Sequence, residues 1–107
     1  MAADLLFTPK PTGTVSITSG VASARVALAA LNSQQVAITN SDASNIAYVE
    51  FGGATVVAVV PNGATPGSMP ILPGQTRGVT VPLGTTNVAA ICTAGTPIVY
   101  FTPGNGT

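Results

Sequence analysis

QVAITNSDASNIAYVEFG, residues 35–52, contains the clearest strand pattern in this chain. In its first part, Val36 and Ile38 are separated by a single residue, which is the two-residue period of a half-buried strand. Residues 40–45 are rich in Asn, Ser and Asp, whose side chains bond to the local backbone and allow the chain to reverse. Residues 46–51 then alternate again. The stretch predicts a strand, a reversal and a second strand, which Gly52 and the following Gly53 end.

Other short segments carry the same alternation and are bounded by Gly, Pro and Asn. The further predicted strands are residues 14–18, 76–81, 86–92 and 97–101. Residues 68–72 predict a short edge strand, because Pro70 cannot donate a backbone hydrogen bond. Seven or eight short strands with turns at near-regular spacing are typical of a β-sandwich or jelly roll. We therefore predict an all-β, single-domain β-sandwich with a jelly-roll-like arrangement.

Two segments need a closer argument. The Ala and Leu content of residues 22–31 favours a helix, but Val26 and Leu28 also alternate with their neighbours as in a strand. Flanking strands and the lack of a convincing cap favour the strand. Residues 54–60, ATVVAVV, have the highest β-propensity in the chain, and such a run predicts a strand fully paired in the sheet interior.

Between the last two predicted strands, residues 93–96 predict a hairpin-length connection in which Gly95 adopts a positive φ. The alternation also predicts which side chains form the core. These are Val36, Ile38, Val49, Phe51, Val57, Val79, Val81, Ile91 and Val99.

The chain divides into an N-terminal arm at residues 1–11, a β-sandwich domain at 12–103 and a flexible tail at 104–107. In the arm, Leu5, Leu6 and Phe7 are consecutive and apolar, and flanking prolines keep the segment out of a central strand. The arm either folds back as an edge segment on its own domain or anchors this cluster in a neighbouring subunit. We expect Leu5, Leu6 and Phe7 to be interaction residues.

Charge is scarce in this chain of 107 residues: charged residues make up 6%, and the formal net charge is zero. Little electrostatic repulsion keeps copies apart, so we predict a homo-oligomer, a dimer or a trimer. Three basic residues cannot neutralise a run of phosphates, which argues against nucleic acid as a partner. No apolar run approaches the ~20 residues that span a bilayer, and the N-terminal residues do not have the pattern of a secretory signal.

Catalytic chemistry has little support in the residues. The chain has no His, and its Asp and Glu residues are not paired at any local spacing; only folding could bring Asp42 and Glu50 together. The lone Cys92 has no disulfide partner and is expected to be a small buried hydrophobe. We predict a protein that is not an enzyme, with no cofactor and no metal site.

The order of strands and turns from residue 35 to 106 resembles that of small tailed-phage virion proteins. The resemblance lies in Val36, Ile38, Asn40, Phe51-Gly52, Pro73-Gly74, residues 86–91, Gly95-Thr96 and the glycines at 104 and 106. It implies a structural component of the virion, of the capsid decoration or cement type. Such proteins bind the outside of the major capsid protein lattice as oligomers. The expected location is the capsid surface, after assembly in the host cytoplasm.

Two alternatives to capsid decoration remain. The chain could be a head–tail connector, tail or fibre component, which shares the same structural class. It could also be a carbohydrate-binding or receptor-binding β-sandwich module, which would need exposed aromatic side chains; Tyr48 and Tyr100 are its only tyrosines. The resemblance carries no active-site residues.

Overall fold

A computed structural model describes residues 8–9, 13–28 and 35–105 of the chain. These residues form strands and connecting loops, and no helix occurs among them. The strands are β1 (Thr8–Pro9), β2 (Val15–Thr18), β3 (Ala24–Ala27), β4 (Gln35–Asn40), β5 (Ala47–Gly52), β6 (Met69–Ile71), β7 (Thr76–Thr80), β8 (Asn87–Cys92) and β9 (Ile98–Asn105). The all-β prediction is confirmed.

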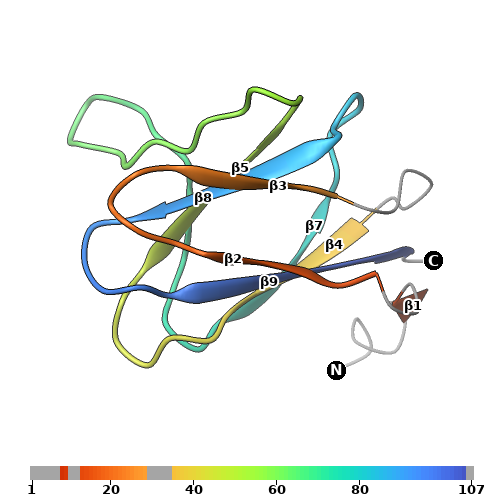
Figure 1. The fold of residues 1–107 in the computed structure, drawn as a ribbon, viewed down its shortest axis with the longest axis horizontal. Helices are drawn as coiled ribbons and strands as arrows, with labels where there is room; N and C mark the ends of the chain where they lie inside the picture. Colours follow the sequence, from red (N-terminus) through yellow and green to blue (C-terminus); the bar gives the residue numbers. More distant parts are fainter. Residues whose placement is uncertain (1–7, 10–12, 29–34, 106–107) are drawn as a thin grey trace.

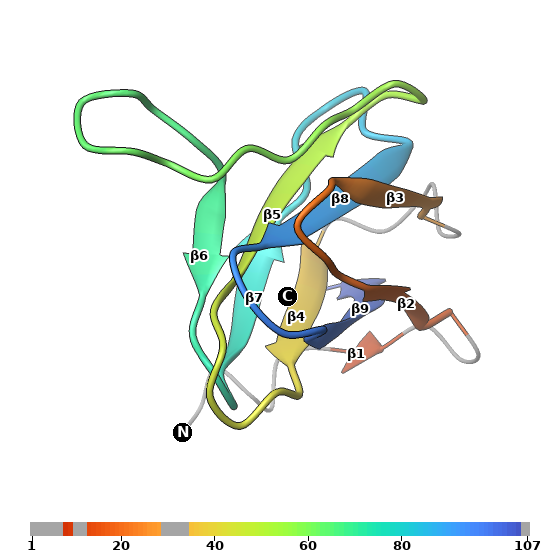
Figure 2. The same ribbon diagram turned by 60° about the vertical axis from the view of Figure 1, so that its left-hand side comes forward.

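The strands form two antiparallel sheets that face each other (Figures 1 and 2). The first sheet has the order β1-β9-β4-β7, with β2 also paired to β9. Because β4 occupies one edge of β9, β1 and β2 lie end to end along the other. The second sheet has the order β3-β8-β5-β6. Side chains from the inner faces of both sheets form the core, as in a β-sandwich.

The strand pairing is nested along the chain. β5 pairs with β6, β4 with β7, β3 with β8 and β2 with β9, so the chain forms one antiparallel ribbon with β5 and β6 innermost. The ribbon folds over on itself, and the pairing of β4 with β9 and of β5 with β8 completes the two sheets. Eight strands in this arrangement form a jelly roll.

The core contains most of the side chains that alternation predicts. Val36, Ile38, Val49 and Val99 are buried, and Phe51, Val79 and Val81 pack against them while keeping part of their surface exposed. Ile91 is only half-buried. Phe101, Ile71 and Val88 add to this core. The prediction is wrong for Val57, whose side chain is 56% exposed.

The wrong prediction for Val57 follows from the wrong prediction for residues 54–60, which form a loop and not an interior strand. Both edges of β5 are already paired, with β6 and β8, so the run that follows β5 has no free neighbour in the middle of the sheet. The amides of Ala58 and Val59 donate to the side-chain hydroxyls of Ser23 and Ser68 instead of to a strand. High β-propensity describes how well side chains fit a pleated, half-buried surface, and that surface is not available here.

Residues 93–96 connect the two sheets and do not form a hairpin, because β8 belongs to the second sheet and β9 to the first. The predicted conformation at Gly95 is confirmed, with φ of 71°. Residues 41–46 likewise carry the chain from β4 in one sheet to β5 in the other. The predicted reversal is confirmed. It takes the chain from the first sheet to the second, and we call it the crossing from β4 to β5.

The two described ends of the chain are paired with each other. This pairing contradicts the predicted tail at residues 104 and 105, and at Thr8 and Pro9 it agrees with an arm that folds back on its own domain. β9 continues to Asn105, so residues 104 and 105 belong to a paired strand and not to a flexible tail. Thr8 and Pro9 pair with these two residues, which places that part of the arm on its own domain. Leu5, Leu6 and Phe7 lie outside the described residues.

Residues 22–31 contain strand β3, and the described part of this segment has no helix. Val26 and Leu28 turn inward while Arg25 and Ala27 are exposed, which is the alternation expected of a strand. Residues 29–31 lie outside the described residues. Pro70 lies in β6, and β6 is an edge strand as predicted.

Candidate interaction surfaces

The crossing from β4 to β5 is organised by Asn40, a fully buried amide. Its Nδ2 donates to the carbonyl oxygens of Asn45, at 2.9 Å, and of Ile71, at 3.0 Å. Its Oδ1 accepts a hydrogen bond from the backbone of Asp42 at 3.0 Å. Because every polar atom of the side chain has a partner, the burial of this amide is compensated.

Asp42 holds the other half of the same crossing. Its Oδ2 accepts hydrogen bonds from the backbone amides of Ser44, at 3.0 Å, and Asn45, at 2.7 Å, and from the Asn45 side chain at 3.1 Å. These bonds favour the ionised carboxylate, above all the bond from the Ser44 amide, so the pKa of Asp42 is lowered from its ordinary value of 3.8. The carboxylate therefore acts as a local anchor of the loop.

The second loop of interest contains a small finger, residues 59–68, that projects from the second sheet (Figure 2). At its base, Ser68 donates from its backbone to the carbonyl of Val59 at 2.7 Å, and Val59 donates back to the Ser68 hydroxyl at 2.9 Å. The same hydroxyl donates to Glu50 at 2.8 Å. At the tip, Asn62 and Thr65 exchange two backbone hydrogen bonds. Five hydrogen bonds thus hold a protruding loop in one shape.

Apolar side chains are exposed beside this finger. Val57 and Val59 are 56% and 47% exposed, and Val21, in the turn between β2 and β3, is 76% exposed. The hydrogen bond from Ala58 to Ser23 brings the two loops together. We call Val21, Val57 and Val59 the valine surface. Neither residues 19–23 nor residues 53–68 contain a charged residue, and the Glu50 carboxylate at the base of the finger is bonded to the Ser68 hydroxyl.

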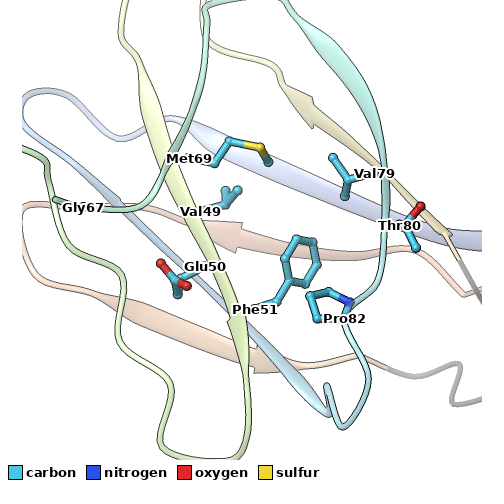
Figure 3. Close-up of a pocket in the computed structure, with 8 residues that line it drawn as sticks. All are labelled: Val49, Glu50, Phe51, Gly67, Met69, Val79, Thr80 and Pro82. Atoms are coloured by element: carbon cyan, nitrogen blue, oxygen red, sulfur yellow. The ribbon is translucent and has the colours of Figure 1, made fainter.

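A groove of about 350 Å³ opens between the two sheets at the edge formed by β6 and β7. Figure 3 shows the side chains of Phe51, Met69, Val79 and Pro82 converging on it, while Glu50 points away, to the other side of β5. The remaining lining residues are Val49, Gly67 and Thr80. The groove is the exposed margin of the hydrophobic core, and its chemistry is suited to apolar side chains rather than to a charged ligand.

The two carboxylates that folding could have paired are held in separate networks. Asp42 is bound by its own loop, and Glu50 is bound to Ser68 at the base of the finger. The loop that contains Asp42 joins β5 at Ala47. Glu50 lies three residues further along this strand, which is about 10 Å from Ala47. Cys92 is buried as expected, and its Sγ lies 3.5 Å from the carbonyl oxygen of Gly95. Across residues 8–9, 13–28 and 35–105, no three potential metal ligands are grouped.

The Pro, Asn and Gly content of residues 61–67 predicts a loop, and the finger confirms it, whereas the sequence did not predict the groove. Two glycines of the finger mark it in the sequence. At Gly67 an added Cβ would collide with the backbone of Pro61, and Gly63, which follows Asn62 in the turn, has a φ of 56°. The groove has no local signal. It forms where two edge strands from different sheets meet, and this meeting depends on the pairing of the whole ribbon.

Comparison of the chain with protein families, with curated proteins and with solved structures finds no match to any of them. In the part of the chain that the structure describes, no helix has the length and apolar character needed to cross a membrane.

Proposed function

We propose that this chain is a non-enzymatic structural protein of a tailed-phage virion, a decoration or cement subunit on the outside of the major capsid protein lattice. The observation that carries the proposal is the valine surface, on loops of a jelly roll that contain no charged residue. Jelly rolls recur in viral capsid proteins, although a fold by itself does not determine a function. The choice of a phage capsid as partner rests on the resemblance of residues 35–106 to small virion proteins.

The physical properties of the surface fit a subunit that covers a lattice in many copies. The formal net charge is zero, so neighbouring copies repel one another little. Val57 and Val59 stand on a loop held by Ser23 and Ser68, so little additional ordering is needed when they bind. Each valine side chain buried on the capsid contributes about 1 kcal/mol, at about 25 cal/mol per Å² of apolar area.

The proposal is tested by quantitative mass spectrometry of particles from the phage that encodes the chain. A copy number comparable with that of the major capsid protein supports decoration. A copy number comparable with that of the portal or tail-tip proteins indicates the connector or tail alternative. Absence from the particle contradicts the proposal.

A second experiment tests the surface itself. Val57→Ser together with Val59→Ser is expected to weaken binding to undecorated capsids by about tenfold or more, because about 1.4 kcal/mol corresponds to a factor of ten. The matched control is Ile98→Ser, which changes a side chain that is 37% exposed on β9, away from the finger. Equal binding by the double variant and the control would exclude the valine surface as the contact.

A further inference from the structure

The groove between β6 and β7 leaves part of the hydrophobic core uncovered. Phe51, Met69 and Val79 pack against the buried core residues but are only half-buried themselves. β7 pairs with β4 along one edge, and no described strand pairs with its other edge, so its backbone groups on that side are open to a further segment. An extended apolar segment would fill the groove and cover this edge at the same time.

The sequence supplies one segment with the required chemistry. Leu5, Leu6 and Phe7 are three consecutive large apolar residues, and they lie outside the described residues. Residues 10–12, 29–34 and 106–107, the other parts outside the description, contain no such cluster. The charges of the two parts are complementary. Asp4, which is negative, precedes the cluster, and Arg77, which is positive, lies on the same face of β7 as Val79 in the groove.

The cluster cannot fill the groove of its own subunit while β1 is paired. In the register of the first sheet, Pro9 lies opposite Gly104, Gly104 opposite Gln35, and Gln35 opposite Thr80. Three strand spacings of about 4.8 Å place Pro9 about 14 Å from Thr80, at the rim of the groove. Phe7, Leu6 and Leu5 are two, three and four residues from Pro9, which gives reaches of about 7, 11 and 14 Å at full extension, so Leu5 alone comes as far as Thr80 and the three side chains do not fill the groove together. A groove filled by this cluster therefore belongs to another copy.

We propose that the groove between β6 and β7 binds Leu5, Leu6 and Phe7 of a second copy of this chain. The contact joins an arm of one subunit to a groove of the next, so reciprocal exchange gives a dimer and a cyclic arrangement gives a ring. Burial of the cluster against Phe51, Met69, Val79 and Pro82 drives the association. This inference does not rest on the proposed function, since it concerns only contacts between copies of the chain.

Two variants separate the arm from the groove. The arm variant carries Leu5→Ser, Leu6→Ser and Phe7→Ser and keeps its groove. The groove variant carries Pro82→Glu, which places a charge at an exposed position in the lining. Met69→Glu on the edge strand β6 is a second groove variant, and circular dichroism melting shows which variants are folded. Leu83→Ser changes a fully exposed side chain outside the groove and is the matched control.

Native mass spectrometry and sedimentation velocity measure the outcome. We expect the wild type and the Leu83→Ser control to be oligomeric, and the arm and groove variants to be monomeric when examined alone. An equimolar mixture of the two variants is expected to form heterodimers, because one intact arm and one intact groove remain. The inference is overturned by a monomeric wild type, by folded groove variants that stay oligomeric, or by a mixture that does not associate.

Discussion

The side-chain amide of Asn40 donates a 3.0 Å hydrogen bond to the carbonyl oxygen of Ile71, and so ties the last residue of β4 in one sheet to the edge strand β6 of the other. The backbone of Asn40 extends the connection, since its amide donates to Gln75 and its carbonyl accepts from Gly74. One buried residue thus joins the crossing between the sheets to the turn between β6 and β7. This turn leads into one wall of the groove.

Asn40→Ala is expected to lower the free energy of unfolding by about 1–3 kcal/mol, because it leaves the Ile71 and Asn45 carbonyls and the Asp42 amide without their partner. Chemical denaturation measures the change. Thr76→Ala is the control, since it removes only an exposed hydroxyl contact with Thr39 and should change stability by no more than about 0.5 kcal/mol. Equal effects of the two substitutions would show that the buried amide does not stabilise the fold.

Alternation predicted those features of the fold that depend on neighbouring residues. Val36 and Ile38 are buried, Ala47 and Val49 face the core, and Pro70 lies in an edge strand. A period of two determines which side chains share a face, and a missing donor excludes a central position. These constraints act within a few residues, so they can be read without knowledge of the partner strands.

Features that depend on distant pairing could not be predicted in this way. The sequence of residues 54–60 favours a strand, but β6 and β8 already occupy both edges of β5. Gly104 and Asn105 belong to the predicted tail, yet they pair in β9, and Pro103 before them is buried. Along one edge of β9, the pairing with β2 ends at Phe101 and the pairing with β1 starts at Gly104. Pro103 lies between these two pairings, so no described strand on that edge requires a backbone hydrogen bond donated by Pro103. The groove and the sheet crossings likewise arise from the topology.

Asp42→Asn is expected to reduce stability at neutral pH and to have a smaller effect in acid. The pKa of Asp42 is lowered in the folded chain, so the ionised carboxylate contributes stability that is present above the unfolded value of 3.8. This contribution is lost as the pH falls through the folded pKa. Denaturation of wild type and variant at several pH values should show a constant difference between about pH 5 and 7 that shrinks below about pH 4. A difference that grows in acid would contradict the assigned role.

Gly95→Ala is expected to cost more stability than Gly74→Ala, although both glycines have φ of 71°. An added Cβ at Gly74 meets nothing within 4 Å, so the cost there is the backbone strain of about 1–2 kcal/mol. At Gly95 the Cβ would also collide with the side-chain amide of Asn45, which is bonded to Asp42. Thermal denaturation compares the two variants.

A double-mutant cycle isolates the collision from the strain. In an Asn45→Ala background the amide is absent, so Gly95→Ala should then cost about as much as Gly74→Ala. If the cost at Gly95 is the same in both backgrounds, the contact between the two crossings does not restrict this position.

Ser68→Ala is expected to loosen the finger without unfolding the domain. The hydroxyl of Ser68 accepts a hydrogen bond from the Val59 amide and donates one to Glu50, so its removal leaves both groups unpaired. Because the Val59 amide has no strand partner to replace the hydroxyl, it should open more readily to solvent. Hydrogen exchange followed by NMR should show faster exchange at Val59, while the amides of the buried strand β8 keep their protection.

The control is Ser41→Ala, which removes an exposed hydroxyl bond to the carbonyl of Ile98 at the opposite crossing. It should leave the exchange rate at Val59 unchanged. Because Val57 and Val59 depend on this anchor for their orientation, Ser68→Ala should also weaken capsid binding if the valine surface is the contact. Unchanged exchange at Val59 in Ser68→Ala would show that the hydroxyl does not hold the finger, and the shape of the loop would then depend on its backbone bonds alone.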